Sequence, residues 1–188
     1  VITLLLVLFV FEGAYLFHTN IITKSTDFTA AVLPAALSSL TNNDRITKGL
    51  GHLEYDSLLT KAAQEKANDM AIHGYFAHVS PTGKTPWFWL DQMGYKYDYA
   101  GENLAVNFID SQDVETAWMN SPSHRDNILK KEYTKSGIAV AQGMYQGQEV
   151  TFVVQLFAKP STALSSTAPI KAPVSRPTNP VVIESKKA

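Results

Sequence analysis

The sequence predicts an α+β fold in which helices stack on a small antiparallel sheet. Apolar residues recur at helical spacing through the first half of the chain, and two β-rich runs flank a Gln146-Gly147 turn in the second half. Of the 188 residues, 45% are apolar and 11% aromatic, which is enough for a packed core. Helices that precede a hairpin, without regular alternation, are typical of α+β domains.

The clearest helix runs from Asp56 to Gly74. Asp56 is suited to the N-cap position, and Gly74 is the residue type that ends helices. An earlier helix is expected over residues 35–48. Between the two caps, the apolar residues that recur at helical spacing are Leu58, Leu59, Ala62, Ala63, Ala67, Met70 and Ala71.

Two shorter helices follow. In the first, Thr85 precedes Pro86, a residue favoured at the first helical position, and Gly94 ends the helix. The second is expected in the segment DSQDVETAWMNSP, which Pro122 terminates. Its apolar face carries Val114, Ala117 and Trp118.

The strands are expected near the end of the folded region. Residues 136–158 contain two β-rich runs, one on each side of Gln146-Gly147, and this pattern predicts a β-hairpin. A third strand is expected in the segment AGENLAV, residues 100–106. Together with the helices, these strands place the folded domain at residues 35–159.

The two ends of the chain differ in composition from this domain. Residues 1–22 are almost entirely apolar, with Glu12 as the single charge, and at about 1.5 Å per residue they can cross a bilayer. We expect a transmembrane anchor or signal anchor there, with a signal-peptide remnant or a buried or peripheral helix as alternatives. Residues 23–34 are expected to form a linker. Residues 160–188 are rich in Pro, Ser and Thr and are expected to form a flexible tail.

Charge and cysteine content exclude several classes of function. The net charge of −1 offers no basic surface for nucleic acid. The absence of cysteine excludes disulfides, thiolate metal sites and a cysteine nucleophile. The run His124-Arg125-Asp126-Asn127 superficially matches a kinase catalytic loop, but the other kinase motifs are missing from the chain.

Three polar residues lie at positions that a purely structural role explains least well. Glu102 lies inside an apolar strand, where a carboxylate needs a partner. His78, in an irregular segment between two helices, and His124 are the candidate partners. His73 is explained by its place at a helix C-terminus, where a cation is favoured, and His52 by a surface loop.

Four segments in this order resemble the CAP superfamily, which comprises cysteine-rich secretory proteins, antigen 5 and pathogenesis-related proteins and is also called SCP-like. The segments are YFAHVSPTGKTPWFWL, AGENLAV, AWMNSPSHRDNIL and SGIAVAQG with TFVVQLFA, and they cover about residues 37–159. Because it has no cysteine, the chain resembles the cysteine-free bacterial branch of the family.

The resemblance implies a three-layer α-β-α sandwich with a central cleft and an extracytoplasmic location. It also implies a cleft cluster of His78, Glu102 and His124, completed by a second acid three residues after Trp118. Ser121 occupies that position. This departure puts in doubt any mechanism that needs two carboxylates.

Three classes of function follow from these expectations. The first is a binding module for a lipid, a glycan, another cell-envelope ligand or a divalent metal. Zinc would be held by His78 and His124, and Glu102 would orient one of the two imidazoles. Its groove could be lined by some of five aromatic residues, most of which are expected to be ordinary core: Tyr75, Phe76, Trp87, Trp89 and Tyr99. The second is a peptidase or cell-wall hydrolase with the same residues, or with Ser80, Ser121 or Ser123 as nucleophile. The third is a purely structural or interaction domain.

Overall fold

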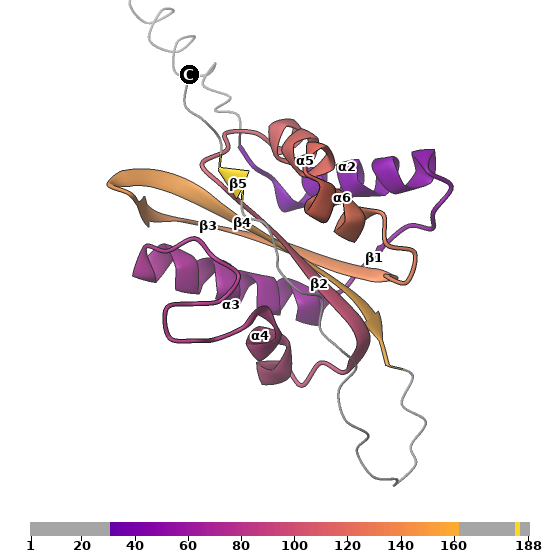
Figure 1. Cartoon of the computed structure of the whole chain (residues 1–188), viewed down its shortest axis with the longest axis horizontal. Coiled ribbons are helices and arrows are strands. Elements are labelled where there is room, and N and C mark those ends of the chain that lie inside the picture. Colours follow the sequence, from indigo (N-terminus) through magenta and orange to yellow (C-terminus); the bar gives the residue numbers. More distant parts are fainter. Residues whose placement is uncertain (1–30, 162–182, 185–188) are drawn as a thin grey trace, which may run out of the picture. The chain divides into compact units, whose positions relative to one another are not determined.

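The computed structural model describes residues 31–161 and 183–184 (Figure 1). The described helices are α2 (Pro34–Thr47), α3 (Ser57–His73), α4 (Pro86–Gln92), α5 (Ser111–Asn120) and α6 (Pro122–Ile128). The described strands are β1 (Glu54–Tyr55), β2 (Tyr97–Val106), β3 (Lys135–Tyr145), β4 (Gln148–Pro160) and β5 (Ile183–Glu184).

The strands form one sheet in the order β1-β3-β4-β2-β5. The three long strands in its centre are antiparallel, as predicted, but β1 pairs with β3 and β5 with β2 in parallel. The expectation of a purely antiparallel sheet was therefore wrong at both edges. Each edge strand has only two residues, too few for the alternating pattern by which a strand is recognised in a sequence.

Helices cover both faces of this sheet. In Figure 1, α3 and α4 lie on one face, and α2, α5 and α6 lie on the other. Two separate groups of buried apolar residues fill the space between the layers, one centred on α3 and one on α5 and α6. This arrangement confirms the predicted three-layer α-β-α sandwich.

The long helix α3 begins and ends where the sequence predicts. The Asp56 side chain accepts hydrogen bonds from the backbone N–H groups of Leu58 (2.9 Å) and Leu59 (3.0 Å). Gly74 takes the left-handed conformation, with φ of 63°, that ends many helices. Helix α3 therefore stops directly before the irregular segment that carries His78.

The hairpin also forms as predicted. Gln146 and Gly147 both have positive φ, 50° and 79°, as a two-residue turn between right-twisted strands requires. The strands that it joins, β3 and β4, pair from Tyr145 and Gln148 back to Lys135 and Ala158.

The segment after α5 forms a further helix, α6, which the sequence patterns above do not predict. Pro122 ends α5, but it also stands at the first position of α6, where its fixed φ suits a helix. Ser121 is the last residue before α6, and its side chain does not cap that helix. Trp118 anchors α5 to the sheet, because its buried Nε1 donates to the Leu104 carbonyl at 3.0 Å.

The predicted membrane helix, residues 1–22, lies outside the described residues, and so does most of the predicted linker. Among the residues that the structure describes, no helix is both long enough and apolar enough to cross a bilayer. Val32, in the last part of the predicted linker, is buried in the core on the α5 side. Strand β5 lies within the segment predicted as a tail.

Candidate functional site

Three consecutive residues of β2 hold the site together. Side chains alternate along a strand, so Glu102 faces the α3 and α4 layer, while Gly101 and Asn103 face α6. A Cβ atom on Gly101 would collide with the Tyr133 hydroxyl, which explains the glycine. The two neighbours of Glu102 along the strand therefore pack against the opposite helix layer.

Glu102 bonds to His78, which settles which histidine partners the buried carboxylate. His78 Nδ1 lies 2.5 Å from Glu102 Oε1, and the two residues are 5% and 4% exposed. Since a carboxylate only accepts, Nδ1 carries the proton, and Nε2 of a neutral ring carries the lone pair. A buried, charge-assisted bond of this length holds the imidazole in one orientation.

The second carboxylate oxygen of Glu102, Oε2, differs from the first in its hydrogen bonding. Oε2 is buried and has no hydrogen-bond partner among the described residues. A buried carboxylate oxygen without a donor is costly, by about 1–3 kcal/mol. An unsatisfied buried acceptor of this kind needs an explanation, such as a bound water, ion or ligand.

His124 lies in the opposite layer from His78, on α6. Its Nδ1 lies 2.7 Å from the Ser121 hydroxyl, and its backbone carbonyl accepts from Asn103 at 3.2 Å. Asn127 donates to the Glu102 carbonyl (3.1 Å) and to Asn103 Oδ1 (3.0 Å). These two asparagines therefore fix α6 beside the strand that carries Glu102.

The three candidate serines, Ser80, Ser121 and Ser123, all lie in the described part of the chain, and none of them forms the hydrogen bonds of a Ser-His-acid triad. Such a triad needs the hydroxyl and the carboxylate on one imidazole. Here the Ser121 hydroxyl bonds to His124, whereas Glu102 bonds to His78. The Ser80 hydroxyl serves the local turn, since it bonds to the Thr82 hydroxyl and accepts from the Lys84 backbone N–H.

The donor set for a metal is sparse. Within residues 31–161 and 183–184, no three His, Cys, Asp or Glu side chains are grouped as ligands for an ion. A zinc ion at His78 and His124 would need water or a ligand atom for its remaining positions.

Most of the five aromatic residues considered for a groove belong to the core, as expected. Tyr75, Phe76 and Trp89 are at most 9% exposed and pack with α3. Trp87 is partly buried against the same core, and Tyr99 is 39% exposed. Their large apolar surfaces stabilise the layer that carries His78.

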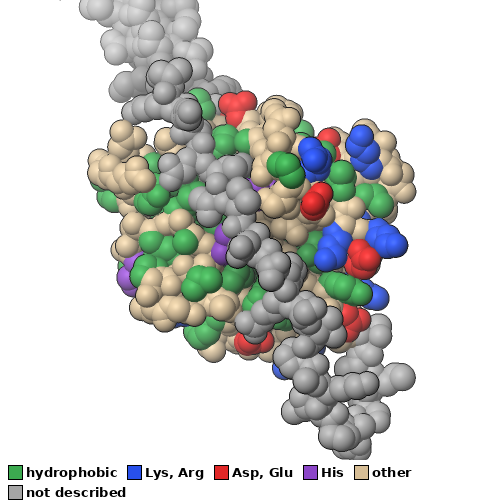
Figure 2. Space-filling model, viewed as in Figure 1, with side chains coloured by type: hydrophobic (Ala, Val, Ile, Leu, Met, Phe, Trp, Pro, Cys, Tyr) green, Lys and Arg blue, Asp and Glu red, His purple; other side chains and the backbone are tan. Residues whose placement is uncertain are grey.

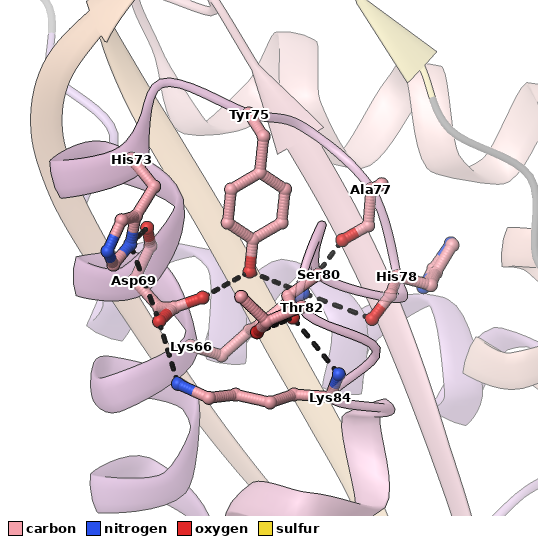
Figure 3. Close-up of polar contacts among 9 residues, drawn as sticks. All are labelled: Lys66, Asp69, His73, Tyr75, Ala77, His78, Ser80, Thr82 and Lys84. Atoms are coloured by element: carbon pink, nitrogen blue, oxygen red, sulfur yellow. Dashed lines mark hydrogen bonds and ion pairs between the residues drawn. The ribbon is translucent and has the colours of Figure 1, made fainter.

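Lys66 is a residue of this region that the sequence analysis missed. Its side chain is fully buried on α3, and its Nζ bonds to the segment that carries His78 (Figure 3). Burial lowers the pKa of the Lys66 ammonium, while the carboxylates of Glu102 and Asp69 oppose that shift. The available signal was a lysine four residues after Ala62 and four before Met70, within the apolar stripe of α3.

Charged side chains are unevenly distributed over the face that Figure 2 shows. Figure 2 shows histidine side chains near the middle and left of one face, while most lysine, arginine, aspartate and glutamate side chains gather on its right.

An α-β-α sandwich with a buried His-Glu pair between a helix layer and a strand defines the class of this domain. The chain belongs to the CAP family, the cysteine-rich secretory protein family, whose model matches residues 39–157. The resemblance noted in the sequence is thereby confirmed, although this member has no cysteine at all.

Two relatives come from Bacillus subtilis (strain 168). The uncharacterized protein YkwD is 36% identical over 120 residues, which cover 64% of this chain and 47% of the relative. The uncharacterized membrane protein YlbC is 34% identical over 106 residues, which cover 56% of this chain and 31% of the relative. The chain thus spans less than half the length of either protein.

Two solved structures share the fold. An extracellular protein of Bacillus anthracis str. Ames that contains an SCP domain is 30% identical, with a TM-score of 0.57. The similarity covers 66% of this chain and 39% of that one. An outer surface protein of Borrelia burgdorferi is 27% identical, with a TM-score of 0.59, and the similarity covers 68% of this chain and 92% of that one.

Proposed function

We propose that this CAP domain is a ligand-binding module, with its site at the His78–Glu102 pair and His124 beside it. The observation that carries the proposal is the buried Oε2 atom of Glu102, which has no donor among the described residues. A ligand that donates a hydrogen bond there would remove the cost of the lone acceptor.

The chemistry of the site favours a glycan or a similar polyol over the other ligand classes. A carboxylate oxygen needs a donor, and sugar hydroxyl and acetamido groups supply donors without charge. A lipid or a zinc ion are the alternatives, and zinc would be held by the two imidazoles.

A hydrolytic function is the less supported alternative. The Ser121 hydroxyl and the Glu102 carboxylate bond to different imidazoles, so the groups of a serine hydrolase are not aligned. A purely structural role for the buried pair predicts that its loss changes stability and no binding.

The binding proposal is tested by calorimetric titration of the full chain with N-acetylglucosamine oligomers, zinc chloride and phosphatidylglycerol vesicles. We expect the oligomers to bind, and Glu102→Gln to weaken them by about tenfold or more, since a hydrogen bond to a charged group is lost. Glu65→Gln, at an exposed glutamate of α3, is the matched control.

Other outcomes point to other functions. Binding of zinc alone, lost in both His78→Ala and His124→Ala, would replace the glycan proposal with a metal site. Destabilisation by Glu102→Gln with no ligand bound by the native chain would favour the structural role. Cleavage of peptidoglycan that depends on His78 would favour the hydrolase.

We also propose that the domain lies outside the cytoplasm, anchored by residues 1–22. The apolar composition of that segment supports the anchor. The names of similar proteins, an extracellular protein, an outer surface protein and a membrane protein, support the location. Protease added to intact cells should degrade the domain, and a protected domain would contradict this location.

A further inference from the structure

Lys66 is a buried lysine whose three ammonium donors are all used within the segment before α4 (Figure 3). Its Nζ donates to the carbonyl oxygens of Ala77 (2.7 Å) and His78 (3.0 Å). The third donor lies 3.3 Å from the Tyr75 hydroxyl, and the ammonium also lies 4.9 Å from the centre of that ring. Lysine is rarely buried to this degree unless it is paired in this way.

The two carbonyl groups flank the Cα atom of His78. The Ala77 carbonyl belongs to the peptide plane before that atom, and the His78 carbonyl belongs to the plane after it. When both planes are held, the direction of the His78 side chain from its Cα atom is held as well. The surrounding segment has no helix or strand to do this.

A second set of contacts keeps the Lys66 ammonium in place. The Tyr75 hydroxyl donates to Asp69 Oδ2 at 2.5 Å, and Lys84 Nζ lies 3.2 Å from Asp69 Oδ1. Asp69 is one helical turn beyond Lys66 on α3, while Tyr75 and Lys84 come from the two ends of the irregular segment (Figure 3). The network therefore ties both ends of this segment to α3.

We propose that Lys66 is the positioning residue of the site, and that its ammonium fixes the backbone on both sides of His78 and so aims the imidazole at Glu102. The inference rests on the proposed function only in taking the His78–Glu102 pair as the binding site. The role belongs to the buried lysine and does not require it to touch a ligand.

The test follows the proton between His78 and Glu102 by NMR on the ligand-free full chain, with ¹⁵N-labelled histidine. A short hydrogen bond to a carboxylate gives a strongly deshielded N–H proton, which His78→Gln assigns by its loss. We expect Lys66→Met to lose this signal while the backbone amide spectrum of the sheet is kept. Lys66→Arg, which keeps the charge and several donors, should restore the signal.

The control and the fallback variant decide the remaining cases. Lys61→Met, at an exposed lysine of the same helix, should leave the signal unchanged. If Lys66→Met does not fold, Lys66→Gln is used instead. The shorter glutamine side chain keeps a donor but cannot bond to both carbonyl groups. The His78 N–H signal should then shift upfield. A folded Lys66→Met or Lys66→Gln chain with the native signal overturns the inference. Loss of the signal in a chain that binds none of the ligand probes supports the inference, while the proposed function fails.

Discussion

At the scale of single residues, Glu115 shows how burial changes the chemistry of a carboxyl group. Its side chain lies between α5, α2 and β4, with 1% of the residue exposed. Thr41 donates to Oε2 at 3.0 Å, and Gln155 Nε2 donates in turn to the Thr41 hydroxyl at 3.1 Å. Burial raises the pKa of Glu115 to about 8; Thr41 opposes the shift, and the nearby Asp44 carboxylate adds to it.

This raised pKa predicts that the domain loses stability as the pH rises. The unfolded chain releases the Glu115 proton near its ordinary pKa of 4.5, whereas the native state keeps it to about 8. The contribution is therefore complete below 4.5 and is lost as the pH rises through 8. In the native chain, Glu115 should make the free energy of unfolding fall by up to about 1.4 kcal/mol per pH unit across that range. We expect Glu115→Gln to lack this part of the pH dependence.

The measurement is urea unfolding of both chains at several pH values between 5 and 9. Glu65→Gln, which replaces an exposed glutamate of α3, should keep the native pH dependence. An equal slope in the native chain and in Glu115→Gln would show that Glu115 is not protonated in the folded state.

At the scale of elements, α3 packs against a row of small residues on β3. Gly137, Ala139, Ala141 and Gly143 alternate with the residues that face the other layer. A Cβ atom on Gly143 would lie 2.6 Å from the Ala71 carbonyl oxygen, and one on Gly137 would collide with the backbone at Leu59 and Thr60. Helix and strand therefore approach more closely than ordinary side chains allow.

Gly137→Ala should push α3 away from the sheet, because the atoms in its way belong to the helix backbone and cannot rotate aside. We expect the free energy of unfolding to fall by about 1–3 kcal/mol, the usual cost of overpacking. Thermal unfolding followed by circular dichroism measures the effect.

Gly51→Ala is the matched control, since a Cβ atom there meets nothing within 4 Å. Its expected change is within about 0.5 kcal/mol, as at most surface sites. A Gly137→Ala chain as stable as the control would mean that α3 does not depend on this close contact.

The elements also show how far sequence patterns reach. Asp56 and Gly74 mark the ends of α3 correctly, because capping depends on neighbouring backbone groups. Pro122 ends α5 as predicted, but the same local logic did not predict that it also begins α6. The two-residue edge strands carry no detectable pattern, since their place depends on a long neighbouring strand.

At the scale of the whole molecule, the sheet separates two apolar cores. Leu59 belongs to the core under α3, and Ile128 belongs to the core under α5 and α6, and both are fully buried. The central strands supply side chains to both cores, in alternation.

Substitutions in the two cores should therefore act independently. We expect Leu59→Ala to cost about 2–5 kcal/mol, Ile128→Val about 0.5–1.5 kcal/mol, and the double variant their sum within about 0.5 kcal/mol. Chemical denaturation of the native chain, the two single variants and the double variant completes the double-mutant cycle.

A pair inside one core provides the contrast. The Tyr133 and Phe157 rings stack with their centroids 5.4 Å apart, so Tyr133→Leu and Phe157→Leu should couple by about 0.5–3 kcal/mol. A larger coupling across the sheet than within this stack would contradict the separation into two cores.

The sequence by itself determined the helices with strong caps, the hairpin, the family motifs and the need of Glu102 for a partner. These features depend on local backbone chemistry, or on the cost of burying one charge. Only the tertiary structure decided that His78 is that partner, that His124 stands on a helix in the other layer, and that Lys66 is buried beneath the His78 segment. Such pairings join residues far apart along the chain, and only the stacking of both helix layers on one sheet brings them together.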